Sequence, residues 1–351
     1  MPTTSQSFWT DIIDRGVPAL VRDLNDGEAI KLTEQYGTHN YKPLPVNLVR
    51  GDGAEAWDGA GKHYIDCVGA YSAVAHGHLN ERVVKAMTEQ LDRLALASRA
   101  VYTSELGLFL KGLADYCGTD MVCPMNTGAE AIETAIKIAR KWSYTIKGVP
   151  EDRAEIIVCQ DNFHGRTTTI VGFSTEAGYK TGFGPFTPGF KIIPFGDIDA
   201  LRNAITPNTA AFLCEPIQAE GGINIPPDGY LAGVRNLCTE SNALLVWDEV
   251  QTGFCRTGTR FAWQYEDAAP DIVAVGKPLG GGVMPVAAAV GRREVMSVFK
   301  PGDHGSTFGG NPLGCVVALT ALAEMEVEDY CGLALRKGAR LLDGLRALNS
   351  P

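Results

Sequence analysis

The amino-acid sequence predicts an α/β fold in which helices sandwich a mostly parallel central sheet. Short continuous apolar runs bounded by loop residues are typical of strands buried on both faces. Four such runs occur: EIIVCQ, AAFLCEP, ALLVWDEV and DIVAVGK. Segments with helical spacing of apolar residues separate them, as in folds that alternate strand and helix. The 351 residues, of which 45% are hydrophobic and 21% charged, suffice for a large domain and part of a second.

The remaining segments can be assigned in chain order. The first fifty residues are polar and mixed, with one predicted helix around Asp26 to Tyr36. Residues 51–67 predict a hairpin, because a Gly-Ala-Gly turn separates AEAWD from KHYIDC. ERVVKAMTEQLDRL and NPLGCVVALTALAEME have helical spacing. TGAEAIETAIKIARKW predicts a stronger helix, because Thr127 can cap its N-terminus and Glu130 can close a capping box.

The overall composition excludes several classes of function. A formal net charge of −10, without a run of Lys or Arg, disfavours a nucleic-acid partner. The nine cysteines are scattered and form no C-x-x-C pair, so we expect a reducing compartment and neither a disulfide framework nor a zinc site. No apolar run is long enough to span a membrane, and the N-terminus lacks the features of a secretory signal or transit peptide. We therefore expect a cytoplasmic protein without a membrane partner.

Motifs for competing chemistry are absent from the sequence. No G-x-x-x-x-G-K-[ST] phosphate loop and no G-x-S-x-G nucleophile elbow occurs. His76 and His78 lie next to glycine with no carboxylate or thiol close in sequence, so no metal site is expected there.

The residues that follow each predicted strand are the candidates for chemistry, because ligands in such sheets bind beyond the carboxyl ends of the strands. Polar or ionisable groups follow each apolar run, so they lie along the edge of the sheet that the carboxyl ends of the strands form, which we call the rim. They are Asn162 to Arg166, Glu215 to Glu220, Asp248 to Gln251, and Lys277. Any one group alone is typical of a solvated loop, whereas four in succession indicate a functional rim.

Lys277 is the most informative residue of this rim. A lysine in a partly desolvated cleft has a lowered pKa and forms Schiff bases with aldehydes. Asp248 lies 29 residues earlier at another strand end, where a carboxylate can keep a pyridine nitrogen protonated and the ring an electron sink. Gly128 opens the strong helix, whose N-terminal N–H groups can bind a phosphate. Together these residues predict a site for pyridoxal 5′-phosphate (PLP).

The motifs around these residues resemble those of the class III, fold-type I PLP aminotransferases. The segment LLVWDEVQTGFCRTG, followed by PDIVAVGKPLGGG, is similar to the Asp-to-Lys signature of that family. Other segments are similar to the ornithine δ-aminotransferase subfamily: YGTHNYKPLPV, YSAVAHGH, PMNTGAEAIETAIKIARKW, NFHGRT, GFGPFTPGF, EPIQAEGG and HGSTFGGNPLGC. The resemblance covers roughly residues 35 to 325.

The resemblance implies a role for each residue that would bind the cofactor. Lys277 would bind PLP and then act as the base of transamination, and Asp248 would pair with the pyridine nitrogen. The other implied contacts are Gln251 to the phenolic oxygen, Phe163 stacked on the ring, Gly128 and Ala129 on the phosphate, and Thr307 on the phosphate of a neighbouring subunit in a homodimer. His164 stands among these positions where relatives often have an aromatic residue.

The resemblance also implies the substrates. Tyr41 and Arg166 would hold the α-carboxylate of ornithine, Tyr71 would line the pocket, and Glu220 would be a gating carboxylate, with Glu215 in support. The implied reaction moves the δ-amino group of ornithine to 2-oxoglutarate. It yields glutamate and glutamate 5-semialdehyde, which cyclises to pyrroline-5-carboxylate, in two half-reactions at one site.

The expected domains are an N-terminal segment of a small domain (1–50), a large PLP-binding domain (51–325) and the start of the C-terminal small domain (326–351). Family members continue beyond this point with an arginine that pairs with Glu220, so we expect an incomplete small domain and impaired activity. Two alternatives stay open. One is another ω-aminotransferase, acting on N-acetylornithine, lysine or 4-aminobutyrate, although Tyr41 and Tyr71 favour ornithine. The other is a catalytically silent, cofactor-free remnant of the fold.

Overall fold

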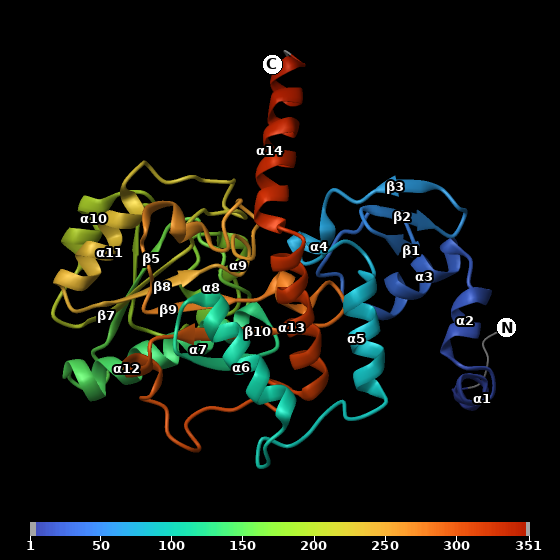
Figure 1. The fold of residues 1–351 in the computed structure, drawn as a ribbon, viewed down its shortest axis with the longest axis horizontal. Helices are drawn as coiled ribbons and strands as arrows, with labels where there is room; N and C mark the ends of the chain where they lie inside the picture. The colour runs from blue at the N-terminus through green and yellow to red at the C-terminus, as the bar shows by residue number, and fades with distance from the viewer. Residues whose placement is uncertain (1–4, 349–351) are drawn as a thin grey trace. The chain divides into compact units, whose positions relative to one another are not determined.

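The computed structural model describes residues 5–348, and the chain divides into two compact units. The first unit contains the chain up to Gly69 together with Gly77–Leu79, and the second contains Ala70–His76 and the chain from Asn80 onward (Figure 1). Within residues 5–348, no helix has both the length and the apolar character needed to cross a membrane.

The first unit combines three helices with a small antiparallel sheet. The predicted helix over residues 26–36 is confirmed, and Asn25 and Glu28 form its capping box, with the Glu28 N–H donating to Asn25 Oδ1 at 3.0 Å. The predicted hairpin is confirmed as β2 and β3, and β1 extends it by one strand. The elements are α1 (Ser5–Arg15), α2 (Val17–Asp23), α3 (Asp26–Tyr36), β1 (Leu48–Asp52), β2 (Glu55–Asp58) and β3 (His63–Ile65).

The second unit is built around a seven-stranded sheet with the order β4-β10-β9-β8-β7-β5-β6. The strands from β9 to β6 run parallel, whereas β10 is antiparallel to both of its neighbours. The four apolar runs are β5, β7, β8 and β9, so the mostly parallel α/β sheet is confirmed. The bounds are β4 (Met121–Met125), β5 (Glu155–Cys159), β6 (Phe190–Ile193), β7 (Thr209–Cys214), β8 (Leu244–Asp248), β9 (Ile272–Val275) and β10 (Ala287–Gly291).

Helices cover both faces of this sheet. Alternate side chains of β5 enter opposite cores: Ile157 and Cys159 pack with residues of α6 and α11, whereas Ile156 and Val158 pack with α7. Figure 1 shows α13 between α5 and α6, both of which it contacts. The helices are α4 (Gly69–Ser72), α5 (Glu81–Leu91), α6 (Ser104–Cys117), α7 (Gly128–Trp142), α8 (Thr168–Gly172), α9 (Ala177–Lys180), α10 (Ile198–Ala204), α11 (Tyr230–Glu240), α12 (Arg293–Met296), α13 (Pro312–Val327) and α14 (Tyr330–Ala347). Three short non-α turns complete the unit: η1 (Ser143–Lys147), η2 (Ala262–Glu266) and η3 (Lys277–Gly280).

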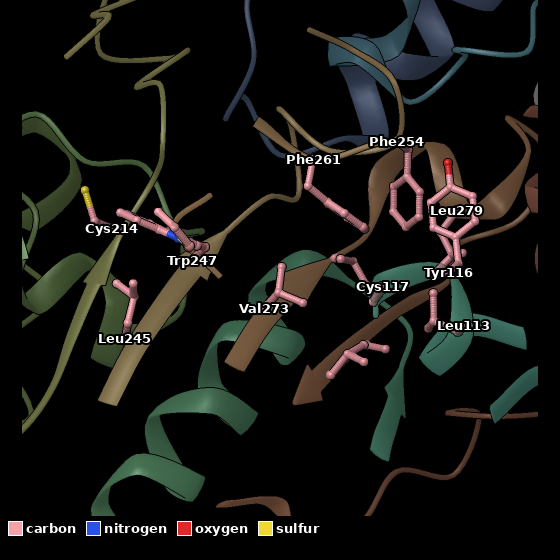
Figure 2. Close-up of a cluster of buried hydrophobic side chains, with 14 of the residues drawn as sticks. Leu113, Tyr116, Cys117, Cys214, Leu245, Trp247, Phe254, Phe261, Val273 and Leu279 are labelled. Atoms are coloured by element: carbon pink, nitrogen blue, oxygen red, sulfur yellow. The ribbon is translucent and has the colours of Figure 1, made fainter. Parts of the chain in front are cut away.

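The core under the α6 face fixes the strand ends that carry the site. Trp247, the residue before Asp248, is fully buried, and its indole N–H donates to the Ala268 carbonyl at 2.8 Å. Figure 2 shows Trp247 and Val273 on neighbouring strands of this core. Because side chains alternate along a strand, burying Trp247 on this face sets the side on which Asp248 emerges.

Candidate active site

The carboxyl ends of the parallel strands meet at one cavity of about 190 Å³. The loops after β5, β7, β8 and β9 contribute most of its lining, and the N-terminus of α7 contributes the rest. The lining residues are Gly128, Ala129, Phe163, His164, Gly165, Glu215, Ile217, Asp248, Val250, Gln251, Thr252 and Lys277. The structure therefore brings together eight of the predicted residues: Lys277, Asp248, Gln251, Gly128, Ala129, Phe163, His164 and Glu215.

Lys277 enters this cavity from a strained position. It has a φ of 34°, a left-handed backbone conformation that is rare for a residue with a Cβ and that clusters at functional sites. Its half-buried amine donates to Gln251 Oε1. Burial lowers the pKa of Lys277, and this effect outweighs the nearby carboxylates Glu220, Asp248 and Glu215, which act in the opposite direction. The neutral amine required for nucleophilic and base chemistry is therefore more accessible than in an exposed lysine.

Asp248 is held in one orientation by two hydrogen bonds. His164 Nδ1 lies 2.7 Å from Asp248 Oδ2, and the Val250 N–H donates to Oδ1 at 3.0 Å. Both side chains are buried. Burial alone lowers the pKa of His164, but the hydrogen bond to Asp248 and its charge reverse the direction, so the pKa of His164 is raised. A fixed, buried carboxylate of this kind can hold a proton on a ring nitrogen.

Glu215 adds a fourth ionisable group to the lining of the cavity. Its Oε2 accepts from the Phe163 N–H at 3.2 Å, which orients the loop after β5. Burial raises the pKa of Glu215 to about 8, opposed by His164 and reinforced by Asp248. Near neutral pH the side chain is therefore largely a neutral acid.

The N-terminus of α7 forms another part of the cavity lining. The predicted capping box is present: the Glu130 N–H donates to Thr127 Oγ1 at 3.3 Å, and Glu130 Oε2 accepts the Thr127 N–H at 2.9 Å. A Cβ on Gly128 would lie 2.8 Å from Val250 Cγ1, so a glycine is required at this position. The helix terminus thus offers N–H groups and a positive dipole end to an anion.

The remaining predicted residues lie outside this lining. Arg166 is exposed, with its guanidinium 3.8 Å from the centroid of the Tyr179 ring, and Glu220 is exposed in the loop after β7. Thr307 is exposed and lines a separate cavity of about 540 Å³ with Arg99 and others. Tyr71 is exposed in α4 of the second unit, whereas Tyr41 is exposed in the first unit.

One polar residue near the site, Arg256, was missed by the sequence reasoning, whereas Glu249 fell within the predicted rim but was given no role there. Glu249 follows Asp248 but points the other way, where its carboxylate accepts from Thr252 Oγ1 at 2.5 Å and the Trp263 N–H at 3.0 Å. Arg256 acts on Lys277 through its charge. The only sequence signal for both was their position in the loop after a strand that carries a predicted site residue. Among the described residues, no cluster of His, Cys, Asp and Glu is arranged to hold a metal ion.

The two buried glutamates predict how stability depends on pH. Burial raises the pKa of Glu249 to about 8, as it does for Glu215, from an ordinary value near 4.5. Between these limits the folded state binds more protons than the unfolded state, so the unfolding free energy should fall as pH rises from about 5 to 8. A Glu249→Gln variant, which mimics the neutral acid, should show a weaker fall in melting temperature over this range. Exposed Glu151→Gln is the control, and parallel curves for the wild type and Glu249→Gln would contradict the expectation.

Comparisons with known proteins fit this geometry. A family model described as aminotransferase class-III matches residues 36–351. The ornithine aminotransferase of Brevibacillus brevis is 51% identical over 92% of this chain and 81% of its own length. The ornithine aminotransferase of a Geobacillus species is also 51% identical, with the same coverage.

Solved structures agree with the sequence relatives. An ornithine aminotransferase from Toxoplasma gondii, described with partial occupancy of PLP at its active site, has a TM-score of 0.91 and 43% identity, covering 99% of this chain and 80% of that one. An acetylornithine aminotransferase from Elizabethkingia anophelis has a TM-score of 0.83 and 44% identity, covering 93% of this chain and 79% of that one.

Proposed function

We propose, from the premise that this chain belongs to the class-III aminotransferase family, that it transfers the δ-amino group of L-ornithine to 2-oxoglutarate. The products are glutamate and glutamate 5-semialdehyde, which cyclises to pyrroline-5-carboxylate. The observation that carries the proposal is the cavity in which Lys277 and Asp248 meet the N-terminus of α7. The identity to ornithine aminotransferases supports the choice of substrate.

The residues of the cavity fit PLP. A Cβ at position 128 would lie against Val250. Because Gly128 has none, the backbone stays open at the helix terminus, where the phosphate would bind. Asp248 lines the same cavity as a buried carboxylate that would hold the ring nitrogen, and Gln251, which accepts from Lys277, would contact the ring oxygen. When bound, this cofactor supplies an electron sink that stabilises negative charge on the substrate carbon.

The chain's own residues perform the proton transfer and the binding. The amine of Lys277 would take the proton from the δ-carbon of ornithine, because its lowered pKa makes the neutral form more accessible than in an exposed lysine. Asp248, fixed by His164 and Val250, would keep the ring nitrogen protonated. Arg166 and Tyr41 would hold the α-carboxylate, since a guanidinium fork and a hydroxyl suit that group.

Further parts of the proposal concern assembly and location. Thr307 would bind the cofactor phosphate of a second copy, which makes a homodimer the smallest active unit. Glu220 would act as the gating carboxylate. The proposal also includes three domain segments, residues 1–50, 51–325 and 326–351. It further includes a cytoplasmic location, which the scattered cysteines support.

A half-reaction experiment tests the proposed activity. The PLP-loaded protein is mixed with ornithine alone, and loss of the visible absorbance band of the lysine-bound cofactor is followed. We expect ornithine to remove the band and 2-oxoglutarate to restore it. If ornithine leaves the band unchanged, the substrate assignment is wrong. If ornithine removes the band but 2-oxoglutarate does not restore it, the defect lies in the second half-reaction, at the binding of 2-oxoglutarate.

Acetylornithine is the second candidate substrate, favoured by the similarity to the Elizabethkingia anophelis enzyme. A Tyr71→Ile variant separates the candidates, because a hydroxyl partner matters for free ornithine with its charged α-groups and less for an acetylated amine. We expect kcat/KM for ornithine to fall about tenfold, the factor for losing one hydrogen bond of about 1.4 kcal/mol. Tyr71→Phe, which keeps the ring, isolates the hydroxyl. An unchanged ornithine rate in Tyr71→Ile would remove the case for ornithine.

A further inference from the structure

Residues 70–72 form an unusual turn at the edge of the second unit. Ala70, Tyr71 and Ser72 have φ values of 48°, 55° and 75°, so three consecutive residues with a Cβ adopt the left-handed conformation. Left-handed residues other than glycine normally occur singly, because the Cβ approaches the following carbonyl oxygen. A run of three persists only where surrounding contacts impose it, and such strain is concentrated at functional sites.

The Arg256 side chain supplies one of those contacts. Its Nη2 donates to the Ser72 carbonyl at 3.2 Å, and the Ala73 N–H closes the turn by donating to the Ala70 carbonyl at 3.2 Å. Arg256 and Ser72 are 184 residues apart in the chain, so this bond joins the turn to the loop after β8.

The loop that carries Arg256 is itself rigid. Phe254 and Cys255 precede it with left-handed φ values of 55° and 66°, and both side chains are buried in the main core. Figure 2 shows Phe254 beside Phe261 and Tyr116 in that core, and the Phe254 and Phe261 ring centroids are 5.6 Å apart. The guanidinium therefore projects from an anchored base and can hold a strained segment.

The turn and Arg256 both act on the environment of Lys277. Ala70, Ala73 and Val74 line a cavity of about 370 Å³ together with Lys277 and residues 126–128 and 282–286. Arg256 is one of the charges that act on the Lys277 amine, and the others are Glu220, Asp248 and Glu215. One arginine thus touches the strained turn and biases the amine of the site.

We propose that Arg256 is a positioning residue of the active site, which holds residues 70–72 in their left-handed turn beside the Lys277 cavity and so fixes the backbone from which Tyr71 would contact ornithine. The substrate part of this inference rests on the proposed function, whereas the control of the turn does not. Arg256 also adds positive charge near Lys277, which favours the neutral amine.

Two substitutions separate the hydrogen bond from the charge. Arg256→Met removes both, and Arg256→Lys keeps the charge but loses the long guanidinium fork. In both variants KM for ornithine should rise about tenfold, with a smaller change in KM for 2-oxoglutarate. The pH at which the visible band of the PLP-loaded protein titrates should rise by about half a unit in Arg256→Met, because a cation near Lys277 is lost. In Arg256→Lys that pH should stay close to the wild-type value.

Hydrogen exchange tests the turn without any cofactor or substrate. In the cofactor-free protein, exchange at the Ala73 amide should quicken about tenfold in Arg256→Met and Arg256→Lys. Arg260→Met is the matched control, because Arg260 lies in the same loop but pairs with Glu326 of α13. It should leave Ala73 exchange and the titration unchanged.

A rescue experiment completes the test. Glycine adopts positive φ without strain. Adding Ser72→Gly to Arg256→Met should therefore lower KM for ornithine part of the way back to the wild-type value. Wild-type Ala73 exchange in Arg256→Met would overturn the positioning role whatever the substrate is. Rapid exchange combined with an unaltered KM would overturn the link between the turn and recognition. If the wild-type protein does not react with ornithine, the proposed function fails, and the exchange result is unaffected.

Discussion

Replacing Lys277 by methionine is expected to lower the rate of transamination by about 10⁴-fold, the upper end of the range for a positioned acid–base group. Methionine keeps an unbranched chain in the half-buried position but carries no amine, so the proton of the substrate carbon has no acceptor there. Lys277 is the amine among the lining residues of the 190 Å³ cavity, and burial lowers its pKa. The visible band of the bound cofactor should be lost together with the rate.

A matched lysine distinguishes this effect from a general loss of stability. Lys147 is also partly buried, and burial lowers its pKa as well, but it donates to the Thr209 and Ser241 carbonyls at 2.7 and 3.3 Å, away from the cavity lining. Lys147→Met should lower the melting temperature and leave the visible band intact. Borohydride reduction followed by peptide mapping should place the cofactor on Lys277 in the wild type. A wild-type band in Lys277→Met would show that another amine holds the cofactor.

The parallel part of the fold was predictable because each buried strand carries its own signal. EIIVCQ, AAFLCEP, ALLVWDEV and DIVAVGK became β5, β7, β8 and β9, and their order along the chain placed Lys277 and Asp248 at one rim. The three other strands of the sheet, β4, β6 and β10, were not predicted. The segments MVCPM of β4 and AAAVG of β10 contain proline or mostly small residues, which carry little strand propensity. Their pairing became visible only from the sheet that they complete.

The contacts within the site were beyond the reach of sequence patterns. His164 and Asp248 are 84 residues apart in the sequence, and Arg256 and Ser72 are 184 residues apart. Neither hydrogen bond can therefore be predicted from local residue spacing. Motif resemblance named positions such as Arg166 and Tyr71, but it gave neither the stacking of Arg166 on Tyr179 nor the left-handed turn at Tyr71. Local patterns predict elements and rims, whereas the fixing of each side chain depends on long-range packing.

Asp248→Asn is expected to lower the rate by about 10²- to 10³-fold, the range for losing one buried electrostatic contact at a reacting group. An amide cannot hold a proton on the ring nitrogen as a carboxylate does, so the electron sink weakens. The effect should be smaller than that of Lys277→Met, because the amine that moves the proton remains. The lysine–cofactor bond, detected after borohydride reduction, should therefore persist while turnover falls.

The partner of Asp248 provides a second readout that does not depend on turnover. The hydrogen bond to Asp248 and the charge of Asp248 raise the pKa of His164 against the effect of burial. With the charge removed and the hydrogen bond weakened, burial dominates, and the pKa of His164 should fall. Nitrogen NMR of the imidazole would follow that change. Glu249→Gln is the matched control, because Glu249 is also buried, one residue away, but accepts from Thr252 and Trp263. This variant should leave both the rate and the pKa of His164 unchanged. An Asp248→Asn variant with a normal rate would show that the ring nitrogen is held by another group. A lowered rate with an unchanged pKa of His164 would show that the His164–Asp248 hydrogen bond is not what the chemistry depends on.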